Sequence, residues 1–168
     1  MAHSNLTVLA LDLGNKTGCA IWRYGELVSV EQKTIKHSSP LKIPGERIAI
    51  FRDYLGAQST LLNTLPSDRS YLIVEKPFHL QGHAIASLYG YFTIAKIFAF
   101  DHDMTFKSYS PMTVKKHLSG SGKASKARMI EAAEDRWSIQ VNTSDEADSL
   151  GLLSLFLEEH EDRYPSSL

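Results

Sequence analysis

Two apolar runs in this chain have the character of buried strands, and each ends in a carboxylate. LTVLALD, residues 6–12, is followed by a turn after Asp12, and YLIVE, residues 71–75, ends in Glu75. The second run suits a central strand that is covered on both faces of a parallel sheet. If the two strands are parallel neighbours, their carboxyl ends lie together and the two acids face each other. Because a buried charge is expensive without a compensating charge, this pair needs a cation.

The remaining pattern predicts the other elements of an α/β fold. We expect further strands over residues 19–23, 27–33 and 105–109, with turns at Gly14-Asn15 and Tyr24-Gly25. Helical periodicity begins near Glu46, and further helices are expected over residues 82–100, after Ser110-Pro111, over 126–136 and over 144–159. The order predicts a mixed five-stranded sheet, with a three-strand antiparallel meander, two parallel strands and helices on both faces.

Length and composition indicate one ordinary globular domain over residues 1–168. Hydrophobic residues make up 43% and charged residues 22%, and no apolar run is long enough to span a membrane. The N-terminal residues lack the pattern of an export signal. Cys19 is the only cysteine, which excludes an intramolecular disulfide and a cysteine-built zinc site. We therefore expect a cytoplasmic protein that is not secreted, in a reducing setting.

A second acidic pair lies near the chain's end. Thr143-x-x-Glu146 is a capping-box pattern that opens a helix, and Asp145 and Asp148 then share one face of its first turns. With Asp12 and Glu75 they make four candidate ligands of oxygen type, which suit Mg²⁺ or Mn²⁺. Two such ions support phosphodiester hydrolysis.

Each of these acids also has a simpler interpretation. Asp12 could cap the Gly14 turn, Glu75 could pair with Lys76, and the two later aspartates could complement a helix dipole.

Charge is unevenly distributed along the chain although the net charge is only −1. No acid lies between Asp103 and Glu131, an interval that contains several basic residues, whereas residues 131–162 carry ten acids against Arg136. A solvated surface is the simpler interpretation of the basic run, and a nucleic-acid contact is the functional one. Removing the four candidate ligands from the count changes the net charge from −1 to +3.

Three segments, LALDLGNKTGCAIW, IVEKPF and SDEADSLGLLSL, resemble in order and spacing the acidic motifs of RuvC-type Holliday junction resolvases. VKKHLSGSGKASKARM resembles the segment between the second and third motifs of that family. The resemblance covers about residues 6–157 and implies the ribonuclease-H-like fold. It implies that Asp12, Glu75, Asp145 and Asp148 are catalytic ligands of two Mg²⁺ ions, for which Mn²⁺ substitutes.

The resemblance also implies DNA contacts and a partner. Lys115 and Lys126 match basic positions near the scissile phosphate, and Phe78 matches an aromatic residue placed against junction bases, although Phe78 could equally return to the core. The same basic run contributes three further candidate DNA-binding residues, Lys116, Lys123 and Arg128. Members act as homodimers on four-way DNA, and the helix expected over 82–100, apolar on more than one stripe, would suit a dimer or a monomeric core.

One departure from the family pattern is Leu13, where bacterial members usually have proline. The chain resembles the divergent resolvases of phages more closely, so we expect it in a bacterial cell or a phage-infected host, cutting four-way junctions or a broader range of branched DNA. Alternatives are a ribosomal-RNA-processing nuclease of the same fold, a non-catalytic DNA-binding module, and an actin-like or sugar-kinase-like ATPase. The ATPases share the opening hairpin but need two such domains.

Overall fold

A computed structural model of the chain describes residues 6–38, 45–62, 69–77 and 83–160. One five-stranded sheet has the order β3-β2-β1-β4-β5. Strands β1, β2 and β3 form the antiparallel meander, and β4 is parallel to both β1 and β5. The strands are β1 (Leu6–Asp12), β2 (Lys16–Arg23), β3 (Glu26–Thr34), β4 (Arg69–Glu75) and β5 (Thr105–Tyr109). The predicted fold class and the predicted pairing of the first and fourth strands are confirmed.

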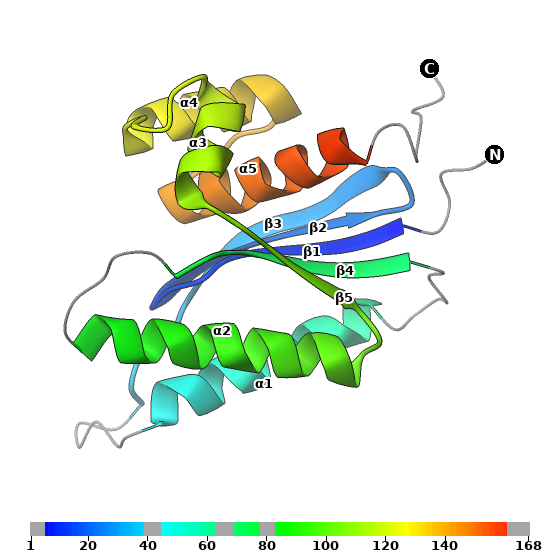
Figure 1. The fold of residues 1–168 in the computed structure, drawn as a ribbon, viewed down its shortest axis with the longest axis vertical. Coiled ribbons are helices and arrows are strands. Elements are labelled where there is room, and N and C mark those ends of the chain that lie inside the picture. Colours follow the sequence, from blue (N-terminus) through cyan, green and yellow to red (C-terminus); the bar gives the residue numbers. More distant parts are fainter. Residues whose placement is uncertain (1–5, 39–44, 63–68, 78–82, 161–168) are drawn as a thin grey trace.

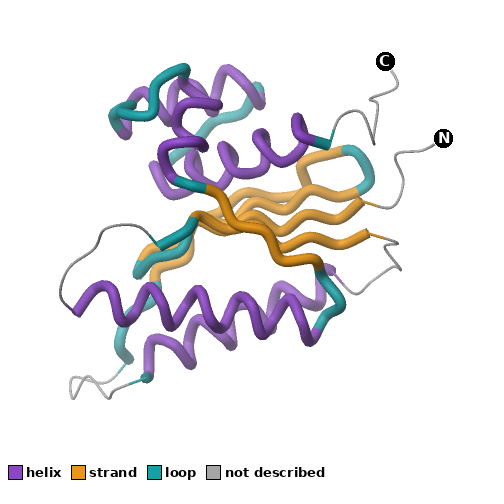
Figure 2. The backbone as a smooth tube through the Cα atoms, viewed as in Figure 1, coloured by secondary structure: helices purple, strands orange, loops and turns teal. Residues whose placement is uncertain are grey.

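Helices cover both faces of the sheet, as predicted. One face carries α1 (Glu46–Leu62) and α2 (His83–Asp101), and Figure 1 shows the others on the opposite side: α3 (Pro111–Ser119), α4 (Lys126–Trp137) and α5 (Ser144–Glu159). Figure 2 shows the sheet as the middle of three layers. Within the described ranges, no helix combines the length and the apolar character needed to cross a membrane.

Several boundaries differ from those predicted. Strand β2 begins at Lys16 rather than at residue 19, because Lys16 and Thr17 already pair with the end of β3. Strand β4 begins at Arg69 rather than at residue 71, because Arg69 and Ser70 already pair with the start of β1. The helix expected after Ser110-Pro111 begins at Pro111 and continues through Ser119.

Alternating side chains of β1 supply two separate apolar cores. Leu9 and Leu11 pack with residues of α1 and α2 on one face, whereas Val8 and Ala10 pack with residues of α3, α4 and α5 on the other. This alternation is the two-residue period of a strand that is buried on both faces. It also fixes which face receives the next residue of the strand, Asp12.

Gly18 allows the first turn of α5 to lie directly on β2. A Cβ atom at this position would be 1.8 Å from the carbonyl oxygen of Asp145, a distance that no side chain could occupy. Gly18 is also the register partner of Asp12 in the β1–β2 ladder. The missing side chain therefore brings the start of α5 against the end of β1.

Gly18→Ala is expected to destabilise the protein by roughly 1–3 kcal/mol or more, because the added methyl group must push α5 away from β2. Gly56→Ala is the matched control, since a Cβ atom there meets nothing within 4 Å inside α1. That control should raise the free energy of unfolding by roughly 0.5–1 kcal/mol. Urea unfolding measures both values, and equal effects of the two changes would contradict the close approach at Gly18.

Candidate active site

Asp12 and Glu75 lie side by side at the carboxyl ends of two parallel strands. Leu11 and Val74 are register partners, so Asp12 and Glu75 are the next residues along β1 and β4. Neighbouring strands run about 4.7–4.9 Å apart. Because Leu11 and Val74 face α1 and α2, the two acids that follow them face the side covered by α5.

The second acidic pair comes from the start of α5, whose first turn is held by a complete capping box. The Thr143 hydroxyl accepts a hydrogen bond from the Glu146 amide at 3.2 Å, and the Glu146 carboxylate accepts from the Thr143 amide at 3.2 Å. This confirms the predicted cap. It also means that buried Glu146 serves the helix end, which leaves its neighbours Asp145 and Asp148 for other contacts.

The electrostatics of the four acids show that they act on one another. Burial, and then the charges of Glu75, Asp148 and Asp145, raises the pKa of Asp12 well above its usual range. Burial and the charge of Asp148 raise the pKa of Glu75 to about 8. Burial likewise raises the pKa of Asp148 to about 6. Full ionisation of the cluster near neutral pH is therefore unfavourable without added positive charge.

Two lysines named from the sequence supply part of that positive charge. Lys115 of α3 lowers the pKa values of Asp12, Glu75 and Asp148, which opposes the effect of burial. Lys126, at the start of α4, does the same for Asp148. Both lysines therefore lie close to the acidic cluster, although neither reverses the shifts.

The other predicted DNA-binding residues are exposed or lie outside the described residues. Lys116 and Lys123 are exposed, as is Arg128, whose guanidinium donates to the Glu131 carboxylate at 2.8 Å. Phe78 lies outside the described residues. The structure thus brings Lys115 and Lys126 to the carboxylates and leaves the remaining basic side chains on the surface.

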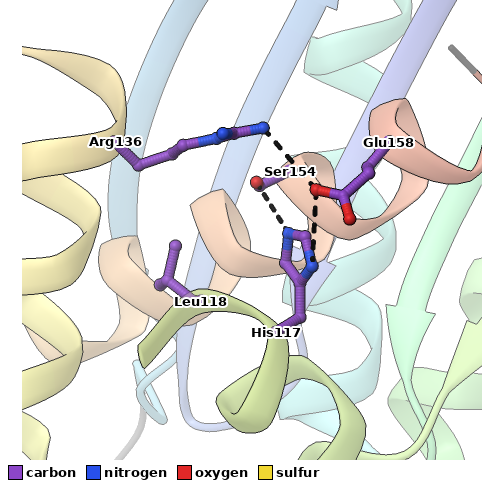
Figure 3. A pocket seen from close by; sticks show the side chains of 5 residues that line it. All are labelled: His117, Leu118, Arg136, Ser154 and Glu158. Atoms are coloured by element: carbon purple, nitrogen blue, oxygen red, sulfur yellow. Dashed lines mark hydrogen bonds and ion pairs between the residues drawn. The ribbon is translucent and has the colours of Figure 1, made fainter. Parts of the chain in front are cut away.

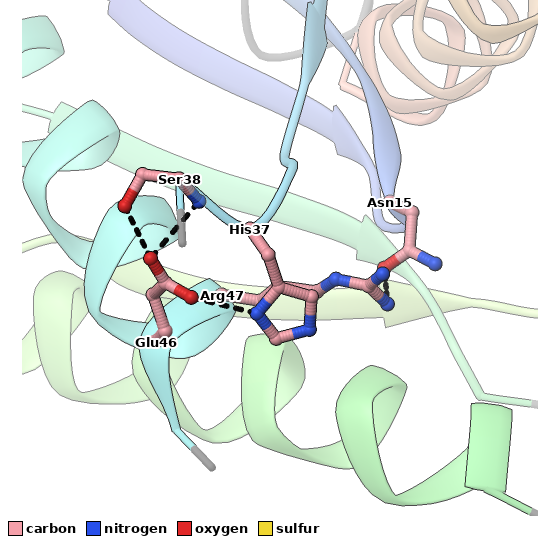
Figure 4. A network of polar contacts seen from close by, with 5 residues as sticks. All are labelled: Asn15, His37, Ser38, Glu46 and Arg47. Atoms are coloured by element: carbon pink, nitrogen blue, oxygen red, sulfur yellow. Dashed lines mark hydrogen bonds and ion pairs between the residues drawn. The ribbon is translucent and has the colours of Figure 1, made fainter. Parts of the chain in front are cut away.

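A polar network beside the β1–β2 turn was not predicted. The Asn15 side-chain oxygen accepts from the Tyr91 hydroxyl at 2.9 Å and from Arg47 of α1 at 3.5 Å, as Figure 4 shows for Arg47. In the same view, the Glu46 carboxylate contacts the His37 ring at 2.7 Å. The two contacts of Asn15 connect the turn after Asp12 to both α1 and α2 on one face of the sheet. Asn15 in a glycine turn was the only signal for them in the sequence.

The donor atoms fit a hard divalent cation. Glu75 Oε1 and Asp148 Oδ1 are buried and have no hydrogen-bond partner in the part of the chain that the structure describes. Carboxylate oxygens are the ligands that Mg²⁺ and Mn²⁺ prefer. Over the same ranges, no group of three or more His, Cys, Asp or Glu side chains is arranged as a ready-made metal cage. Metal binding by the four acids therefore stays a prediction.

No protein-family model matches the sequence, and no curated protein matches it. Two solved structures are similar over most of their length. T. thermophilus RuvC in complex with Holliday junction substrate is 20% identical, with a TM-score of 0.71 over 93% of this chain and 96% of that chain. The Thermus thermophilus RuvC structure is 20% identical, with a TM-score of 0.68 over 91% and 95% of the two chains. This likeness establishes a RuvC-like, ribonuclease-H-like fold, as the sequence motifs predicted.

The raised pKa of Glu75 predicts a pH-dependent stability. The Glu75 carboxyl binds its proton more tightly in the folded state, where its pKa is about 8, than in the unfolded state, where its pKa is near 4.5. The free energy of unfolding, measured in the presence of a chelator, should therefore fall as the pH rises from about 4.5 towards 8. Glu75→Gln removes the charge and should flatten the decline, adding roughly 1–3 kcal/mol at pH 8. Denaturant unfolding across this range measures it. Glu26→Gln, at an exposed position of β3, is the control; an identical pH dependence in Glu75→Gln and the native protein would contradict the buried acidic cluster.

Proposed function

We propose that this chain is a divalent-metal-dependent endonuclease that resolves Holliday junctions by symmetric phosphodiester hydrolysis. The observation that carries the proposal is the mutual electrostatic effect of Asp12, Glu75, Asp145 and Asp148, beside Lys115, on a RuvC-like fold. One protein of this fold was solved with a Holliday junction substrate. The proposed catalytic unit is a single domain over residues 1–168, and broader cutting of branched DNA is the alternative within the same chemistry.

In this proposal the four carboxylates hold two Mg²⁺ ions, for which Mn²⁺ substitutes. Ions of this kind supply an activated water and neutralise the charge that develops on the phosphate. The chain's own contribution is positional: the ends of β1 and β4 fix Asp12 and Glu75, and the capped start of α5 fixes the other two acids. Lys115 and Lys126 add positive charge on the side of the cluster that the DNA backbone approaches.

The exposed basic residues of α3, α4 and the loop between them would extend this contact along the DNA backbone. Lys116 and Lys123 are exposed and would bind phosphates directly. The Arg128 guanidinium would release the Glu131 carboxylate and donate to a phosphate in its place. Phe78, which follows β4 closely in the sequence, is proposed to stack on a base beside the cut site.

A homodimer is proposed through α2. Large apolar side chains on one side of this helix are exposed: Tyr89 by 51%, Ile97 by 50% and Phe100 by 81%. Their spacing places them on one helical face, which they share with exposed Thr93 and Lys96, and large exposed apolar side chains gathered on one face are typical of an interaction surface. Two-fold pairing would give the two active sites that symmetric cleavage of a four-stranded junction requires.

Asp12→Asn is expected to reduce cleavage by more than about 100-fold while junction binding persists, because the change removes a metal ligand and little of the basic surface. The assay uses labelled four-way, three-way, flap and linear DNA with Mg²⁺, together with structured RNA and ATP as competing substrates. Asp53→Asn, exposed on α1, is the control. Paired symmetric nicks in the four-way DNA support the proposal. Undiminished cutting by Asp12→Asn, or turnover of RNA or ATP alone, would refute it.

Phe100→Glu is expected to convert the dimer to a monomer, because a carboxylate would enter the apolar contact. Light scattering coupled to size-exclusion chromatography gives the mass directly. Val28→Glu is the matched control, since Val28 is a similarly exposed apolar residue, 49% accessible, on edge strand β3. Dissociation by Val28→Glu alone would mean that the chains pair through the sheet edge, and a monomeric native protein would refute the dimer.

A further inference from the structure

A polar contact ties α3 to the middle of α5, away from the acidic cluster. The His117 ring nitrogen Nε2 lies 2.9 Å from the Ser154 hydroxyl, and Figure 3 shows both side chains in a pocket between three helices. Ser154 is only 2% exposed. Glu158, one turn further along α5, lies 3.8 Å from the other ring nitrogen and 3.8 Å from Arg136 of α4. The same end of α5 thus contacts both helices that carry the active-site lysines.

A second contact between α3 and α5, around Gly151, is apolar. A Cβ atom on Gly151 would lie 3.0 Å from a methyl group of Val114 and 3.2 Å from one of Leu118, so the two helices touch closely there. Apolar contacts are not directional, and they tolerate small shifts of one helix along another. A hydrogen bond between two nearly buried side chains is directional, and breaking it leaves a buried hydroxyl without a partner. His117 therefore fixes the position of α3 where the apolar contact alone would not.

His117 shares α3 with Lys115, two residues earlier, whose charge acts on three of the four carboxylates. Asp148 and Ser154 are both on α5. The same helix therefore carries one of the four carboxylates and the serine that contacts His117 of α3. We propose that His117 is a positioning residue, which locks α3 on α5 and thereby holds Lys115 beside the carboxylates. The inference rests on the proposed function of that cluster and concerns how its cationic side is held in place.

A serine, a histidine and a carboxylate are also the parts of a hydrolytic triad, but the surroundings of Ser154 do not support one. Ser154 is nearly inaccessible and lies inside α5, where backbone N–H groups donate to carbonyl groups of the preceding turn. No backbone N–H group of α5 beside Ser154 is therefore left to stabilise an oxyanion. The arrangement is suited to holding helices together.

Limited acetylation of the full-length, chelator-treated protein tests the inference without relying on cleavage. Lys115 is half-buried and its neighbour Lys116 is exposed, so the ratio of their acetylation, measured by mass spectrometry, reports whether Lys115 is held. We expect His117→Ala and Ser154→Ala each to raise the ratio by about fivefold, the factor expected from one lost hydrogen bond, and the double variant to raise it no further. His102→Ala is the control, because it removes a histidine contact of 2.9 Å on the opposite face of the sheet.

An unchanged acetylation ratio in both single variants would overturn the inference, as would an additive increase in the double variant. If His117→Ala does not fold, the result for the conservative variant Ser154→Ala decides. Nicking of four-way DNA by the same variants is then measured. We expect the maximal rate to fall by about the same factor, with junction binding unchanged. A raised ratio in a protein that cuts no substrate would refute the proposed function but keep the anchoring role. Normal cutting with an unchanged acetylation ratio would refute the anchoring role of His117 but keep the proposed function.

Discussion

Repulsion among four half-buried carboxylates is the interaction on which the rest of this structure depends. Asp12, Glu75, Asp145 and Asp148 come from three separate elements, and burial together with the charges of neighbouring acids raises the pKa values of Asp12, Glu75 and Asp148. A fold gains nothing in stability from such a cluster, so the surrounding structure must hold it in place. Two apolar cores, one on each face of the sheet, provide that support.

The support acts through a few local features. Parallel pairing of β1 with β4 leaves the first two acids adjacent, Gly18 lets α5 approach the end of β1, and the capping box orients the first turn of α5. Lys115 and Lys126 then reduce the repulsion from the side of α3 and α4. Lys115 and Lys126 are thus on two helices, α3 and α4, that both pack on α5, the helix that carries Asp145 and Asp148. The contacts between these helices therefore help to set the positions of the charges.

Much of this arrangement could be predicted from the sequence, because its signals are local. The apolar runs before Asp12 and Glu75 predicted buried parallel strands, and Thr143-x-x-Glu146 predicted the helix start that presents Asp145 and Asp148. Contacts between distant residues gave no such signal. Gly18 lay just before the strand predicted over residues 19–23, and nothing in the sequence indicated that α5 packs against it. Likewise, Arg47–Asn15 joins a helix to a turn and His117–Ser154 joins two helices, and only the packed structure defines the relative positions of these elements.

The most direct test of the account is to locate manganese in crystals of the protein grown with Mn²⁺, using the anomalous scattering of the metal. Anomalous peaks are expected between the carboxylates of Asp12, Glu75, Asp145 and Asp148, and these peaks should be lost in Asp148→Asn. Manganese bound only elsewhere on the molecule, with the four carboxylates free of metal at saturating Mn²⁺, would contradict it.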